Sequence, residues 1–149
     1  DFERALPAWQ RALELSTNDD MVVATTDWLY MTLRRLGRNG EAERALDRIR
    51  PDMRILENDA YHRRLLMYKG LVPADALMPA DTEDAVQLAT YGYGLANWHL
   101  VRGDTAGAER LFRRILDGSN WAAFGYIAAE AELAQPHREQ PRDGQGAGR

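Results

Sequence analysis

Three segments of this 149-residue chain share one spacing of small and large residues. Each begins with an alanine, has a large residue four positions later and a third core residue seven positions later; the alanines are Ala5, Ala42 and Ala108. Spacings of three and four place such residues on one face of a helix. The alanines are 37 and 66 residues apart, close to one and two periods of about 34 residues. The chain is therefore expected to repeat a unit of two helices.

Helical periodicity covers most of the sequence, and we find no alternation of apolar and polar residues typical of a half-buried strand. Helices are expected at 1–15, 20–36, 41–50, 60–69, 85–101, 105–116 and 121–134. Gly37, Gly70 and Gly103 end three of them. Pro73 and Pro79 bracket a single turn. Short turns between helices of this length predict an all-α fold of antiparallel hairpins.

Local signals add three predictions. Asn18 or Asp19 is expected to cap the helix at 20–36, with Asp19 and Asp20 serving capping and the helix dipole. Asp81 or Thr82 is expected to cap the helix that follows Pro79. Gly92 and Gly94 lie inside the helix at 85–101, where glycine indicates close packing or a break.

The repeated pattern resembles the tetratricopeptide repeat. Ala5, Trp9 and Ala12 match its second helix, as do Ala108, Phe112 and Ile115 with a larger third residue. Gly37 and Gly103 stand five residues before their anchor alanines, as the glycine between the two helices of that repeat does. Leu95-Ala96-x-x-His99 stands where the first helix of the family has Leu-Gly-x-x-Tyr. The resemblance implies hairpins stacked as an α-α superhelix, with one degenerate hairpin in the region 59–101.

The resemblance sets the expected domain limits. The helical-repeat domain is predicted to span residues 1–134, and the Pro, Gly, Arg and Gln-rich segment 135–149 is predicted to be a disordered tail. Because the chain starts at Asp1, within a predicted helix, we expect a fragment of a longer array. The sequence favours neither the cytoplasm nor the periplasm.

In the tetratricopeptide family the concave groove that binds a partner is lined by the first helices. Carried over by alignment, the groove candidates here come from three helices: Asp27, Met31, Arg34, Arg64, Tyr93, Asn97 and Leu100. The resemblance therefore implies that the chain binds a protein or peptide. One interpretation has Arg34 contacting a carboxylate of the partner.

Composition narrows the functional classes. The net charge of −4 argues against nucleic acid, which requires a concentrated basic face. No apolar run approaches the roughly 18 residues that span a bilayer. Lys69 is the only lysine beside many arginines, which we interpret as a genome-composition bias, typical of bacterial sequences. These features favour a binding protein in aqueous solution.

Signals for catalysis are weak. The chain has no cysteine, no Gly-x-Ser-x-Gly and no phosphate-binding loop. His62 and His99 would form a metal site only if they met beside a carboxylate such as Asp59, and no helix carries a close histidine pair. The prediction is a peptide-binding scaffold with no catalytic, cofactor or metal site.

Two alternatives remain open. The first is a self-association module, because Phe2, Leu6, Trp9 and Leu13 form an apolar stripe that lacks a preceding helix to cover it. The second is an accessory domain of a larger enzyme or of a secretion or envelope assembly. In that case His62 and His99 would share a pocket.

Overall fold

The structure is a computed structural model that describes residues 1–78 and 85–134, and these residues form helices and connecting turns without a strand. The all-α prediction is therefore confirmed for this part of the chain. The predicted tail at 135–149 and the predicted cap at Asp81 or Thr82 lie outside the described residues. The elements in chain order are α1 (Phe2–Glu14), α2 (Asp19–Arg35), α3 (Asn39–Leu46), α4 (Asp59–Tyr68), the 3-10 turn η1 (Ala74–Ala76), α5 (Ala85–Gln87), the π-helical segment η2 (Leu88–Gly92), α6 (Tyr93–Val101), α7 (Thr105–Asp117) and α8 (Phe124–Leu133).

Two hairpins form where the sequence predicts them. Helix α2 packs against α3, and α6 against α7. Gly37 and Gly103 make the turns with φ of +70° and +84°, a left-handed conformation that glycine adopts without a steric penalty. Asn18 caps α2 as predicted, because its side chain accepts a hydrogen bond of 2.8 Å from the Met21 amide.

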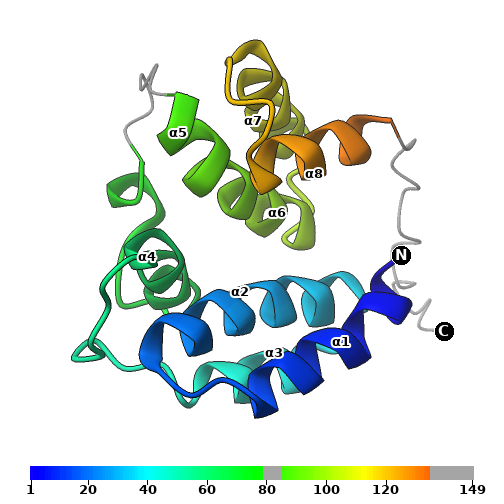
Figure 1. Cartoon of the computed structure of the whole chain (residues 1–149). Helices are drawn as coiled ribbons and strands as arrows, with labels where there is room; N and C mark the ends of the chain where they lie inside the picture. The colour runs from blue at the N-terminus through cyan, green and yellow to red at the C-terminus, as the bar shows by residue number, and fades with distance from the viewer. Residues whose placement is uncertain (79–84, 135–149) are drawn as a thin grey trace, which may run out of the picture.

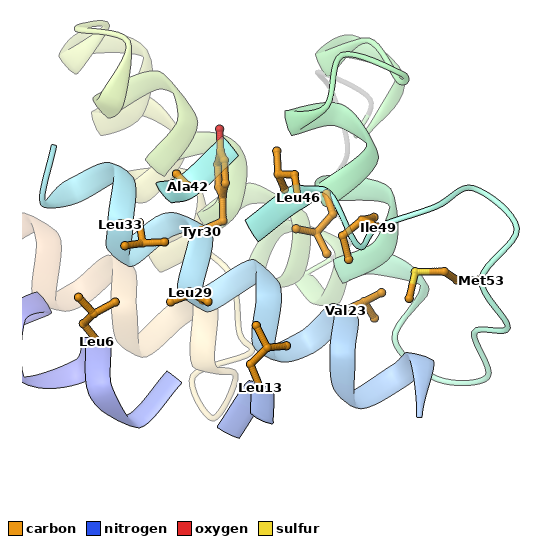
Figure 2. Packing of buried hydrophobic residues seen from close by; sticks show 11 residues of the cluster. Leu6, Leu13, Val23, Leu29, Tyr30, Leu33, Ala42, Leu46, Ile49 and Met53 are labelled. Atoms are coloured by element: carbon orange, nitrogen blue, oxygen red, sulfur yellow. The ribbon is translucent and has the colours of Figure 1, made fainter. Parts of the chain in front are cut away.

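The N-terminal half, α1 to α4, encloses the larger core. Figure 2 shows side chains from α1, α2 and α3 converging on one another. Leu6 and Leu13 of α1 are 4% and 9% exposed, since α2 covers them. Trp9 stacks on Trp28 of α2 at 5.8 Å between ring centroids, and Phe2 lies under the guanidinium of Arg35. The expectation that this stripe is uncovered is wrong for Leu6 and Leu13, which α2 covers, whereas Phe2 and Trp9 are half-buried. Self-association through this face stays a prediction.

Acidic residues at the start of α2 bind a distant loop. Asp20 accepts hydrogen bonds from the amides of residues 56–58, at 2.8–3.3 Å. The Asp19 carboxylate accepts from the amide of Arg54 at 2.7 Å. The interpretation of these acids as helix caps alone is therefore incomplete. They also fix the connection between α3 and α4.

Lys69 has a structural role that its composition-based interpretation missed. Its ammonium donates to the carbonyl oxygens of Leu46 and Ile49, at 3.1 and 2.7 Å. These carbonyls lie at the C-terminal end of α3 and just beyond it, where the negative end of the helix dipole favours a cation. The single lysine thus ties α4 to the end of α3.

The C-terminal half packs unusually closely. A side chain at Gly92 would contact Ile115 at 3.2 Å, and one at Gly125 would overlap the carbonyl oxygen of Ala89. The predicted helix at 85–101 exists, but its residues 88–92 are π-helical. The predicted close packing and the predicted irregularity therefore both occur. The last helix begins at Phe124 rather than at Trp121, which lies before it and is exposed.

The two halves meet along α2. In Figure 1, α2 lies between α1 and α3 on one side and α6 on the other, with α4 at one flank. An aromatic stack crosses the junction: Trp28 of α2 contacts Tyr93 of α6 at 5.7 Å, and Tyr93 contacts Phe112 of α7 at 5.9 Å between ring centroids. None of the helices in the described part of the chain is long and apolar enough to cross a membrane.

Candidate functional site: a cleft between the two halves

A cleft of about 200 Å³ opens where α2, α4, η2 and the start of α8 approach one another. Four of its nine lining residues are aromatic. The lining residues are Trp28, Tyr61, Arg64, Ala89, Thr90, Tyr93, Ala123, Phe124 and Gly125. Phe124 is 74% exposed and stands at the rim, whereas Arg64 and Tyr93 are buried at the base. The cleft therefore combines exposed aromatic surface with a buried polar base.

Arg64 is the central polar group of the base. Its Nε and one terminal nitrogen donate to both carboxylate oxygens of Asp27, and the other terminal nitrogen donates to the carbonyl oxygen of Thr90. The guanidinium also lies over the Tyr61 ring, 4.8 Å from its centroid. Because Arg64 is paired with the Asp27 carboxylate, its charge is neutralised within the protein.

Burial governs the ionisation of this pair. It raises the pKa of the Asp27 carboxyl group, and the charge of Arg64 opposes that rise. Burial, the largest single influence, lowers the pKa of Arg64, but Asp27 together with Tyr68 and Tyr61 raises it, so the net change is upward. Since a guanidinium keeps its charge in proteins, the pair is an ion pair. Removing one member would leave an uncompensated buried charge, which costs about 3–5 kcal/mol.

Two backbone features make room for Arg64. A side chain at Gly94 would collide with the Arg64 side chain, so only glycine fits there. The π-helical turn places the Thr90 carbonyl where Arg64 reaches it. Single π-helical turns occur often at functional sites. The Gly92–Gly94 region, singled out in the sequence for packing, thus shapes the cleft.

A second polar cluster holds α8 beside the cleft. Arg35 of α2 donates to both carboxylate oxygens of Glu132 at 2.8 and 3.0 Å, and also to Oδ1 of Asn97 at 3.2 Å. The Tyr93 hydroxyl donates to the same Glu132, at 3.5 Å. Burial, together with Glu132, raises the pKa of Tyr93 above its usual value. Tyr93 therefore remains a neutral donor, and α8 is fixed to both α2 and α6.

The structure gathers some of the predicted groove residues and separates others. Arg64 and Tyr93 line the cleft, and Asp27 lies behind Arg64 as its ion-pair partner. Asn97 belongs to the Arg35 cluster. The remaining three lie away from the cleft lining: Met31 and Leu100 in the C-terminal core, and Arg34 bonded to the Tyr30 hydroxyl at 2.8 Å.

Burial separates these residues further. Asp27, Met31, Arg64, Tyr93 and Asn97 are each 5% exposed or less. In this conformation they support the cleft from behind or form its base rather than project from its surface. Their predicted contact with a partner remains a prediction.

Sequence reasoning missed the rim of the cleft. The groove candidates from the sequence include none of five residues that line the cleft: Trp28, Tyr61, Ala123, Phe124 and Gly125. A signal for Gly125 was present, because a glycine in an alanine-rich helix indicates close approach of another backbone.

The two helical histidines engage different groups. His62 shares a hydrogen bond of 2.8 Å with the carbonyl oxygen of Arg50, and His99 one of 2.7 Å with Asp104. Neither residue lines the cleft. Within residues 1–78 and 85–134, no group of three or more acidic or histidine side chains is placed to hold a metal ion.

Comparison with known proteins adds no relative: no family model, curated protein or solved structure matches this chain.

Proposed function

We propose that the chain is a helical-repeat scaffold of the tetratricopeptide type that binds a peptide segment of another protein at the cleft. The observation that carries the proposal is the aromatic wall of the small cleft. The charged residue in the lining, Arg64, is already paired with Asp27. Trp28, Tyr61 and Phe124 offer apolar surface, and aromatic residues of this kind commonly anchor protein interfaces.

The size of the cleft favours a side chain over a cofactor. Small-molecule sites typically enclose roughly 300–1,000 Å³, and this cleft encloses about 200 Å³. We therefore expect one large apolar or aromatic side chain of the partner to enter it. Flanking residues of the partner would follow the rim.

Packing within the hairpins supports the repeat type. The anchor alanines Ala42 and Ala108 are fully buried, as is Phe112, the large residue of the second pattern. Gly37 and Gly103 make the two turns with positive φ. These positions support the proposed repeat type.

Selection from a phage-displayed random peptide library tests the proposal. Enriched peptides should share a large apolar residue and bind the purified chain in solution. Phe124→Ala should weaken binding of a selected peptide about tenfold. Ile127→Ala is the matched control, because Ile127 is exposed on the same helix but does not line the cleft. Equal loss for both variants, or no enriched peptide, would contradict binding at this cleft.

A further inference from the structure

Two hydrogen-bond donors in the lining of the cleft donate to no acceptor among the described residues. They are the indole N–H of Trp28 and the hydroxyl of Tyr61. The Trp28 nitrogen is accessible to water in the free chain. An indole N–H can only donate, and a buried donor without an acceptor costs free energy. A segment that covers the cleft must therefore bring acceptors for these groups.

Three acceptor groups beside the cleft are, in contrast, already used by the protein. Both carboxylate oxygens of Asp27 accept from Arg64, which also donates to the Thr90 carbonyl. The carbonyl oxygen of Ala123 accepts from two amides in the first turn of α8, at 3.0 and 3.1 Å. The cleft therefore suits a segment that offers carbonyl oxygens and brings few N–H groups of its own.

The aromatic rings of the cleft are held in place by their neighbours. Trp28 stacks with both Trp9 and Tyr93, at 5.8 and 5.7 Å between ring centroids. The guanidinium of Arg64 lies 4.8 Å from the centroid of the Tyr61 ring. Walls of this kind need little rearrangement on binding. A segment that is also rigid before it binds loses the least conformational entropy there.

The common modes of peptide recognition make different demands on such a site. Addition of a β-strand needs the edge of a sheet, and the described part of the chain forms no strand. A bound α-helix uses its carbonyls in its own hydrogen bonds and needs several anchors in a row, whereas a cleft of about 200 Å³ has room for one. A polyproline II segment has free carbonyls and a preformed backbone, and its prolines have no N–H.

We propose that the segment bound at the cleft is proline-rich and adopts the polyproline II conformation. This inference rests on the function proposed above and names the class of its partner. The apolar anchor enters the cleft, and prolines on either side of it pack on the rim at Phe124. Carbonyl oxygens of the segment accept hydrogen bonds from Trp28 and Tyr61. Because proline keeps the residue before it extended, the anchor is presented in its bound shape before binding.

Two matched peptide libraries test the class of segment against the full chain. In the first, the two positions on either side of a varied central residue are proline, and in the second they are alanine, which favours a helix. Proline peptides with a large apolar centre should bind at least about tenfold more tightly than their alanine counterparts. Failure of the proline library while other apolar peptides bind would overturn the inference and leave the proposed function intact. Failure of every peptide would overturn both.

Removing the two donors tests the hydrogen bonds. Trp28→Phe and Tyr61→Phe each keep an aromatic ring and remove one donor, so each should weaken binding of the proline peptide about two- to tenfold. Trp9→Phe is the matched control, since Trp9 stacks on Trp28 but does not line the cleft. Equal weakening by all three variants would show that ring packing, and not donation to the segment, accounts for the loss. That result would overturn the proposed binding mode.

The indole proton of Trp28 reports the contact directly. The chain has four tryptophans, so a nitrogen–proton correlation spectrum has four indole signals, and Trp28→Phe identifies one of them. That signal should move downfield when the proline peptide is added, because a carbonyl oxygen replaces water as its acceptor. A saturating peptide that leaves the Trp28 signal unchanged would overturn the proposed binding mode.

Discussion

The first and last helices of the described chain, α1 and α8, differ in which residues they bury and which they expose. Helix α1 turns its apolar stripe inward onto α2 and keeps its charged residues outside, among them Glu3, Arg4, Arg11 and Glu14. Helix α8 is held inside by a glycine contact and an ion pair, and keeps apolar residues outside. The outer face of α1 is therefore mainly charged, whereas the outer face of α8 is mainly apolar.

Different interactions therefore attach α1 and α8 to the rest of the protein. Apolar burial stabilises α1, so its attachment should be sensitive to lost volume. Helix α8 also buries Ala129 in an apolar core, but directional contacts add to its attachment: the Arg35–Glu132 pair and the close approach of Gly125 to Ala89. The attachment of α8 should therefore respond to the loss of a polar group as well.

The largest difference should appear on truncating one apolar residue at each end. Leu6→Ala removes a side chain that is 4% exposed and should lower the free energy of unfolding by about 2–5 kcal/mol. Ile127→Ala should change it by less than about 0.5 kcal/mol, because Ile127 faces solvent in the single chain. Urea denaturation at low protein concentration measures both. Similar losses of unfolding free energy for the two variants would contradict the difference between α1 and α8.

Removing the carboxylate of Glu132 tests the polar attachment of α8. Glu132→Ala leaves Arg35 without its bidentate partner and should cost about 1–3 kcal/mol, less than for a fully buried pair because Arg35 is partly exposed. Hydrogen exchange should then accelerate in α8 before it does in α1. Glu130→Ala is the control, since Glu130 is an exposed carboxylate on the same helix. Unchanged exchange in α8 would show that glycine packing alone suffices.

Helix capping offers a smaller test, in which one substitution removes a cap and another adds one. Asn18→Ala removes the cap of α2 and should cost about 1 kcal/mol. Ala123→Asp adds a cap to α8 at a residue with φ of −71° and ψ of 140°, the extended conformation typical of a cap, and should stabilise by a similar amount. Thermal unfolding measures both changes. Destabilisation by Ala123→Asp would mean that the start of α8 does not need a cap.

The smallest effect should be the acid sensitivity of the loop before α4. Hydrogen bonds from the amides of Glu57, Asn58 and Leu56 lower the pKa of Asp20 below 3.8. A lowered carboxyl pKa stabilises the fold above the unfolded value and loses that contribution as the pH falls through the folded value. Asp20→Asn should therefore flatten the melting temperature profile between about pH 5 and pH 2, compared with the exposed control Asp75→Asn. An unchanged profile would mean that the loop does not depend on this carboxylate.

Much of the fold could be predicted from local patterns. Asn18, Gly37 and Gly103 act through their own backbone and nearest turn, so their roles follow from the sequence around them. The helix periodicity is equally local. These signals fixed the helices and the two hairpins.

The cleft depends on contacts that no local pattern contains. Arg64 is engaged by Asp27, which is 37 residues away, and by the carbonyl of Thr90. Glu132 binds Arg35 across 97 residues. The repeat pattern gave Arg64 and Tyr93 as groove candidates, and both line the cleft. It could not reveal that Arg64 is neutralised, or that Phe124 forms the rim, because both depend on how the two halves pack.

The bond from Lys69 to the end of α3 has a practical consequence. Acylating reagents find one lysine side chain in this chain, and its nitrogen is already donating to two carbonyl oxygens. Its modification rate should therefore follow how often the α3–α4 junction opens. The acylation rate of Lys69, followed by mass spectrometry, would thus report motion at the junction between α3 and α4.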